Sequence, residues 1–254
     1  VRTDKPLDDS LAEVLQHILL RFGKAEDLVL HVLSDPLGNS DRGFFAKLLE
    51  NIYWNSLNLS RLIIEASRNN VEFPFYERLH SRLNSNVIGR ILRIVEMKYR
   101  KFLEVLTTVT ELFEGSGIDY VVFKTIPPYK YLPRDIDILV DKKSFKKAME
   151  ALTSKGFKIT KTHILHKEVS LAKDDAEIDL HWQVEWMRNR VISADSILHG
   201  SIAYKLGDID VNIPNPTHEL LLVVSHAILQ HHYVTLGEVH YIRSLIARHD
   251  IDWK

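Results

Sequence analysis

Two aspartates stand at alternate positions of a segment that otherwise reads as a buried strand, "RDIDILV" at residues 134–140. Because side chains alternate between the two sides of a strand, Asp135 and Asp137 share one face, and the apolar residues between and after them share the other. Paired carboxylates repel unless a cation neutralises them, and they suit Mg²⁺, which takes a few oxygen ligands together with substrate phosphates. So short a motif also fits a plain solvated strand face. The pattern therefore predicts either a magnesium site or a polar surface.

A second segment, "AEIDLHW" at residues 176–182, repeats this alternation. It places Glu177, Asp179 and His181 on one face and apolar residues on the other. If this strand lies beside the first, three carboxylates converge, which is the equipment of two-metal phosphoryl or nucleotidyl transfer. His181 would then contact phosphate or acceptor, or serve as a structural hydrogen-bond donor, and both alternatives stay open.

The elements that must position these residues follow from the hydrophobic period. Helical spacing precedes residue 115, the period of two characteristic of strands follows, and helical spacing returns after Pro214. The proline of "VEFPFY" is expected to break the helical pattern between the second and third helical regions. The pattern predicts helices over 8–34, 43–70, from about Tyr76 or Ser85 to Glu114, 142–156, 215–232 and 235–250, and strands over 119–124, 135–140, 157–164, 167–173 and 176–184.

This order predicts an α+β fold, with a small mixed β-sheet core flanked by N-terminal and C-terminal helical regions. We expect a helical region over 1–110, the mixed-sheet core over 111–184 and a C-terminal strand and helical region over 185–254.

Composition narrows the class of protein. The 254 residues include 33 Lys and Arg against 34 Asp and Glu, so no bulk positive charge favours nucleic acid. The absence of cysteine excludes disulfides, thiolate metal sites and cysteine nucleophiles. The longest apolar runs, such as "LLLVV" at 220–224, are too short for a membrane span, and no charged-then-apolar leader opens the sequence. We expect a cytoplasmic protein without a membrane partner.

The thirteen histidines raise the question of a second metal site. His226, His231 and His232 stand at i, i+5 and i+6, which misses the i, i+4 spacing that places two ligands on one face of an α-helix. The spacing argues against a histidine metal centre. Trp182 is expected on the apolar side of its strand, where packing is the commoner role.

Four stretches together resemble a known family: "GIDYVVFKT", "RDIDILVDKKSFKKAMEALTSKGFKI", "EIDLHW", and "PTHELLLVVSHAILQHH" with the terminal "DIDW". They are similar to the uncharacterised nucleotidyltransferase family of the polymerase-beta-like nucleotidyltransferase superfamily, over roughly residues 70–254. The resemblance implies a mixed-sheet catalytic core that binds a nucleoside triphosphate with Mg²⁺. It implies that Asp135 and Asp137 are metal ligands, and that Asp179 binds the second ion or helps to deprotonate the acceptor.

The resemblance also implies phosphate contacts near the acids. Lys124 and Arg134 would hold phosphate oxygens or the leaving pyrophosphate. Where the family pattern has glycine after the lysine, this chain has Thr125, followed by "IPP" at 126–128. The hydroxyl of Thr125 remains available to a phosphate, but two prolines remove backbone donors that a phosphate cradle would use.

The function expected from these residues is Mg²⁺-dependent nucleotidyl transfer. A nucleoside monophosphate passes from a nucleoside triphosphate to an acceptor, which is a small molecule, a protein or an RNA, and pyrophosphate leaves. Two alternatives stay open: a catalytically inactive binding protein that keeps the fold, and a metal-dependent phosphohydrolase in which water is the nucleophile. A homo-oligomer is compatible with each.

Overall fold

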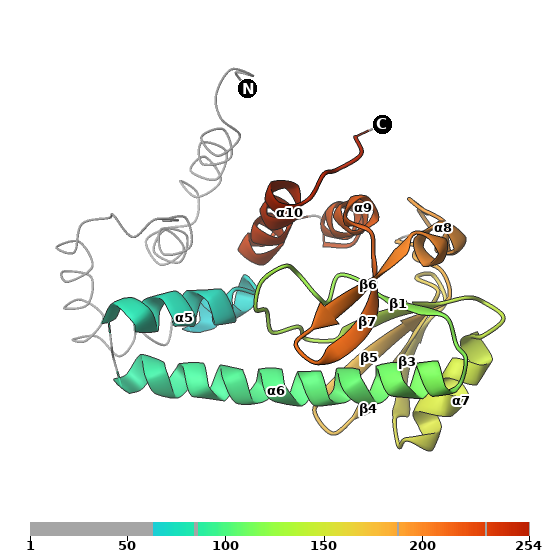
Figure 1. Cartoon of the computed structure of the whole chain (residues 1–254), viewed down its shortest axis with the longest axis horizontal. Coiled ribbons are helices and arrows are strands. Elements are labelled where there is room, and N and C mark those ends of the chain that lie inside the picture. Colours follow the sequence, from blue (N-terminus) through green and yellow to red (C-terminus); the bar gives the residue numbers. More distant parts are fainter. Residues whose placement is uncertain (1–62, 84–85, 187, 232, 254) are drawn as a thin grey trace. The chain divides into compact units, whose positions relative to one another are not determined.

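The structure is a computed structural model that describes residues 63–83, 86–186, 188–231 and 233–253 (Figure 1). The chain divides into two compact units, Val1–Glu96 and Met97–Lys254. The two helices expected over 8–34 and most of the helix expected over 43–70 lie outside the described residues.

In the first unit, the chain turns at Asn69 and Asn70, where Asn70 takes a left-handed backbone with φ of 55°. Helix α5 (Glu72–Leu83) begins directly after this turn and contains Pro74. The expectation that this proline breaks the helical pattern was therefore wrong. Pro74 lies in the first turn, where a backbone N–H has no intrahelical partner to lose, and its fixed φ suits a helix start. Helix α6 (Asn86–Gly115) continues from this unit into the second.

The second unit is built on a five-stranded sheet of order β1-β2-β5-β4-β3. β2 and β5 are parallel, and the other neighbouring pairs are antiparallel. A separate hairpin, β6 with β7, lies beside β1. The strands are β1 (Tyr120–Val122), β2 (Ile136–Val140), β3 (Lys158–His163), β4 (Glu168–Lys173), β5 (Ala176–His181), β6 (Ser201–Leu206) and β7 (Ile209–Pro214).

One face of the sheet packs on α6 and on α7 (Phe145–Ser154). Leu106, Val109 and Phe113 of α6 are fully buried there, against the apolar residues that alternate with the acids, among them Ile136 and Ile138. Trp182 also packs on this side, with its ring 4.7 Å from that of Phe145. Its predicted packing role is confirmed.

The other face of the sheet is partly covered by α8 (Ala194–His199) and α9 (Pro216–His226). The chain continues from α9 through a five-residue π-helix, η1 (Ala227–His231), to α10 (Leu236–Arg248). The sheet residues in this second apolar layer include Val121, Phe123 and Leu139. The acidic residues of β2 and β5 lie on this same face.

The α+β fold class is thereby confirmed: a small mixed sheet with helices before and after it in the chain (Figure 1). Helix α8 and the β6–β7 hairpin were not predicted individually. Within the described part of the chain, no helix combines the length and apolar character needed to cross a lipid bilayer.

Candidate active site

The two acidic segments are neighbours in the sheet. β2 and β5 pair in parallel, and their register sets Asp137 opposite Asp179. Residues opposite each other in adjacent strands project from the same face, so these side chains share the face that also carries Asp135. Burial raises the pKa of Asp135 to about 7, and the charges of Asp137 and Asp179 act in the same direction. The structure thus places the three carboxylates that the sequence singled out on one face of the sheet.

Asp137 is the most enclosed of the three, with 7% of its surface exposed. Its Oδ2 lies 3.2 Å from the Nζ of Lys124, and its Oδ1 lies 3.1 Å from the Nε2 of His181. Burial alone would raise the pKa of Asp137, but the Lys124 ammonium and the contact with His181 hold it well below its ordinary value. Asp137 is therefore ionised and positioned at neutral pH.

His181 is held between two carboxylates. Its Nε2 contacts Asp137, and its Nδ1 lies 3.4 Å from the Oε2 of Glu168, the first residue of β4. The ring is buried and packs edge-on against Phe123 at 5.0 Å. This geometry corresponds to the structural hydrogen-bonding alternative, in which His181 orients Asp137. Glu168 was missed by sequence reasoning, although strand alternation sets it beside His181 in the β4–β5 register.

Lys124 has an unusual backbone for a residue with a side chain, with φ of 55°. Its N–H donates to the Oε1 of Glu219 in α9 over 2.7 Å, and the same oxygen accepts a hydrogen bond of 2.6 Å from the hydroxyl of Tyr241 in α10. Burial raises the pKa of Glu219 to about 7. The ammonium of Lys124 lies 5.6 Å from the ring centre of Trp186, within cation–π range. A buried Glu–Tyr pair thus supports the backbone that aims Lys124 at Asp137.

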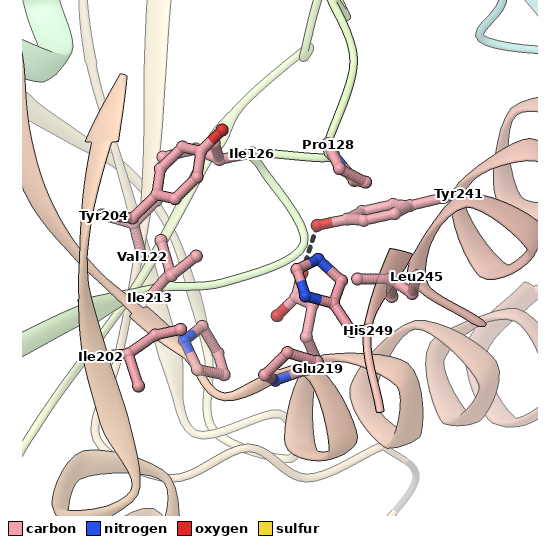
Figure 2. Close-up of a pocket in the computed structure, with 12 residues that line it drawn as sticks. Val122, Ile126, Pro128, Ile202, Tyr204, Ile213, Glu219, Tyr241, Leu245 and His249 are labelled. Carbon is pink, nitrogen blue, oxygen red and sulfur yellow. Dashed lines mark hydrogen bonds between the residues drawn. The ribbon is translucent and has the colours of Figure 1, made fainter. Parts of the chain in front are cut away.

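Glu219 and Tyr241 also line a small, mostly apolar pocket of about 60 Å³ (Figure 2). The hydrogen bond between them is the dashed line in Figure 2, where Ile202, Tyr204 and Ile213 of the β6–β7 hairpin face Leu245 across the pocket. A pocket with so few polar groups is unsuited to a triphosphate, so the carboxylates on the sheet face remain the candidate site.

The hydroxyl of Thr125 makes two hydrogen bonds with the backbone. Its Oγ1 donates to the carbonyl of Phe123 over 3.0 Å and accepts from the N–H of Asp137 over 3.1 Å. Thr125 is 3% exposed. It therefore ties β1 to the start of β2 and fixes the backbone of Asp137, so its hydroxyl is not directed at open space. Arg134, next to the acids in the chain, has an exposed side chain.

The carboxylates fit a divalent cation on structural grounds. The Oδ1 of Asp179 is buried and, among the described residues, accepts no hydrogen bond. A buried carboxylate oxygen without a donor is costly, and coordination to a cation satisfies it. The negative charges of Asp137 and Asp179 also disfavour ionisation of Asp135, and the positive charge of Lys124 only partly offsets them. Asp135, Asp137 and Asp179 are the residues that could hold such an ion.

The sequence model of a family described as "uncharacterised nucleotidyltransferase" matches residues 55–254. The crystal structure of the lincosamide antibiotic adenylyltransferase LnuA, bound to lincomycin, is similar with a TM-score of 0.41 and 18% identity, over 58% of this chain and 96% of that one. No curated protein sequence matches significantly. The family match extends over most of the chain, and the chain therefore belongs to the uncharacterised nucleotidyltransferase family.

Proposed function

We propose that this protein is a Mg²⁺-dependent nucleotidyltransferase that moves a nucleoside monophosphate from a nucleoside triphosphate to an acceptor. The acceptor's nucleophilic atom bonds to the α-phosphorus, the bond from that phosphorus to the bridging oxygen breaks, and pyrophosphate leaves with that oxygen. The observation that carries the proposal is the pairing of Asp137 with Asp179 across parallel strands, beside Asp135. Family membership supports the same reaction class.

In this proposal Asp135, Asp137 and Asp179 hold the metal. When bound, Mg²⁺ would neutralise phosphate charge and align the triphosphate for in-line displacement. Asp179, whose Oδ1 lacks a hydrogen bond among the described residues, is also suited to accept the proton of the acceptor.

The ammonium of Lys124 is the group best suited to the phosphates. Its Nζ lies 3.2 Å from the Oδ2 of Asp137, and its side chain is 11% exposed. The charges of Asp137 and Asp135 both act on this ammonium, so it supplies positive charge beside the two acids. Arg134, exposed and next to Asp135, is suited to the leaving pyrophosphate. His181 and Thr125 contribute by holding the side chain and the backbone of Asp137.

A thermal-shift titration tests the site. ATP, GTP, CTP and UTP are added with and without Mg²⁺ to the wild type, to Asp179→Asn and to the double variant Asp135→Asn with Asp137→Asn. Ligand at a hundred times its dissociation constant stabilises the native state by about 2.7 kcal/mol. We expect a Mg²⁺-dependent shift with at least one nucleotide, lost in the double variant. Glu150→Gln, which changes an exposed acid of α7 paired with Lys146, is the matched control and should keep the shift.

Product identity separates the alternatives. Pyrophosphate release that depends on an added acceptor supports the transferase. Nucleotide consumed without an acceptor supports the phosphohydrolase. A cooperatively folded protein that responds to no nucleotide overturns the proposal and favours a binding protein.

A further inference from the structure

A second cluster of potential metal ligands lies at the junction of α9 and α10. α9 ends at His226, and the π-helix η1 covers Ala227–His231. In an α-helix, residues five apart point about 140° away from each other, which is why the spacing of His226 and His231 argues against a shared site. A π-helix has a wider turn with i→i+5 hydrogen bonds, and such segments are frequent at functional sites. Here the two imidazole ring centres are 4.3 Å apart.

Both imidazoles face one carboxylate. The Nδ1 of His226 and the Nδ1 of His231 each lie 3.6 Å from the Oε1 of Glu238. One ligand atom from each of the three residues lies within 4.8 Å of the others. Zn²⁺ binds histidine nitrogen and carboxylate oxygen at about 2.0–2.2 Å, so neighbouring ligands in a tetrahedral site are separated by roughly 3.3–3.6 Å. The two nitrogen–oxygen distances of 3.6 Å fit coordination, whereas 3.6 Å is long for a direct hydrogen bond.

Surrounding contacts hold these side chains in place. The Oε2 of Glu238 accepts hydrogen bonds from the N–H and the hydroxyl of Thr235, at 2.7 and 3.0 Å, in the capping box that begins α10. Its other oxygen, Oε1, is thereby directed at the histidines. The ring of Tyr233 stacks on His231 at 5.4 Å, and Trp186 lies 5.8 Å from His226. Such outer contacts orient metal ligands and raise affinity.

One nitrogen of the cluster also lacks a hydrogen-bond partner within the described part of the chain. The Nδ1 of His231 is buried and has no hydrogen-bond partner among the described residues. A buried nitrogen without a partner calls for a ligand or a water.

We propose that His226, His231 and Glu238 form a second cation site, selective for Zn²⁺ or a similar divalent transition ion. Two nitrogens and one oxygen suit such an ion, whereas Mg²⁺ prefers oxygens alone. Three protein ligands leave a fourth tetrahedral position open to water or to a donor atom of a substrate. This site adjoins the carboxylates through Trp186, whose ring approaches both His226 and the Lys124 ammonium.

Metal binding by the untagged full chain tests the proposal. The protein is stripped with a chelator, exchanged into chelator-free buffer and titrated with Zn²⁺ by calorimetry, and with Co²⁺ as an absorption probe, in the presence of millimolar Mg²⁺. We expect one equivalent of Zn²⁺ to bind, with a visible Co²⁺ spectrum that reports nitrogen and oxygen ligands. Asp135→Asn with Asp137→Asn should bind Zn²⁺ like the wild type, which separates this site from the proposed active site.

Two variants remove ligands. His231→Ala and Glu238→Gln should each weaken Zn²⁺ binding by roughly 100-fold or more. Glutamine can keep the capping box, so Glu238→Gln should preserve the helix start, checked by circular dichroism and by the melting temperature in chelator. His249→Ala, which removes an exposed imidazole just after α10, is the control and should bind normally. A folded wild type that binds no Zn²⁺, or Zn²⁺ binding unchanged in both variants, would overturn the proposal.

Discussion

Replacing Lys124 with methionine should destabilise the protein through the carboxylate that it leaves behind. The Nζ of Lys124 lies 3.2 Å from the Oδ2 of Asp137, and the two side chains are only 11% and 10% exposed. Methionine keeps most of the length and the apolar stem. It is also no worse suited than lysine to the φ of 55° at this position, so the substitution removes the charge and little else.

The magnitude follows from the burial of the pair. At an effective dielectric constant of about 20, unit charges 3.2 Å apart attract by roughly 5 kcal/mol, and the desolvation of lysine offsets part of this. Removing one partner of a buried pair typically costs about 3–5 kcal/mol, because the other charge stays buried. His181 still contacts Asp137, so we expect a loss of about 3 kcal/mol. Lys124→Met with Asp137→Asn should recover most of it, since no unpaired charge remains.

The assay is urea unfolding at pH 7 in chelator, for the wild type, both single variants and the double variant. The coupling energy of this double-mutant cycle reports the pair. Lys146→Met is the control, because Lys146 is 84% exposed and lies 3.7 Å from Glu150 on α7, so little change is expected. A Lys124→Met variant as stable as this control, or no recovery of stability on adding Asp137→Asn, would show that the buried pair does not stabilise the fold.

Two further predictions concern the residues that support Lys124 and Asp137. Thr125→Val should lower the free energy of unfolding by about 1–3 kcal/mol and weaken Mg²⁺ binding, because the N–H of Asp137 loses its acceptor. Thr125→Ser keeps the hydroxyl and should keep both properties. An equal loss of stability and of Mg²⁺ affinity in the two variants, measured by urea unfolding and calorimetry, would show that only packing matters. Glu219 has a folded-state pKa of about 7 against an ordinary 4.5, so the folded state keeps a proton that the unfolded state releases. The free energy of unfolding should therefore fall by up to roughly 3 kcal/mol as pH rises from about 4.5 to about 7. Glu219→Gln should remove this part of the pH dependence, because glutamine does not titrate and still accepts hydrogen bonds from Tyr241 and Lys124. Parallel stability curves for Glu219→Gln and the wild type across this range would contradict the assignment.

The faces of the two acidic strands could be predicted from the sequence, because side-chain alternation is local. Asp135 and Asp137 share a face in any strand, and the apolar residues between them show which face is the core. The adjacency of β2 and β5 could not be predicted in this way. Strands β2 and β5 are not consecutive in the chain, and side-chain alternation within a strand does not show which other strand pairs with it. The roles of these acids as metal ligands remain predictions.

Three other features could not be predicted from the sequence, each for a physical reason. The exposure of β6 alternates only weakly, so "SIAYKL" gives little strand pattern. The second contact of His181 comes from Glu168, whose role is visible only in the register of β4 with β5. The π-helix Ala227–His231 has a wider turn than an α-helix, so a template of 3.6 residues per turn does not predict that His226 and His231 lie close together.

The parallel pairing of β2 with β5 also bears on how the protein folds. Asp137 and His181 are 44 positions apart in the chain, and Lys124 and Glu219 are 95 apart. Contacts between distant segments form slowly, because loop-closure entropy is lost before those contacts stabilise the chain. β3, β4 and β5 are successive antiparallel neighbours and can associate early, whereas the carboxylates meet only when β2 docks. A partly folded chain would thus contain paired β3, β4 and β5 without Asp137 beside Asp179. Binding of a divalent ion to these carboxylates would then report the completed native state.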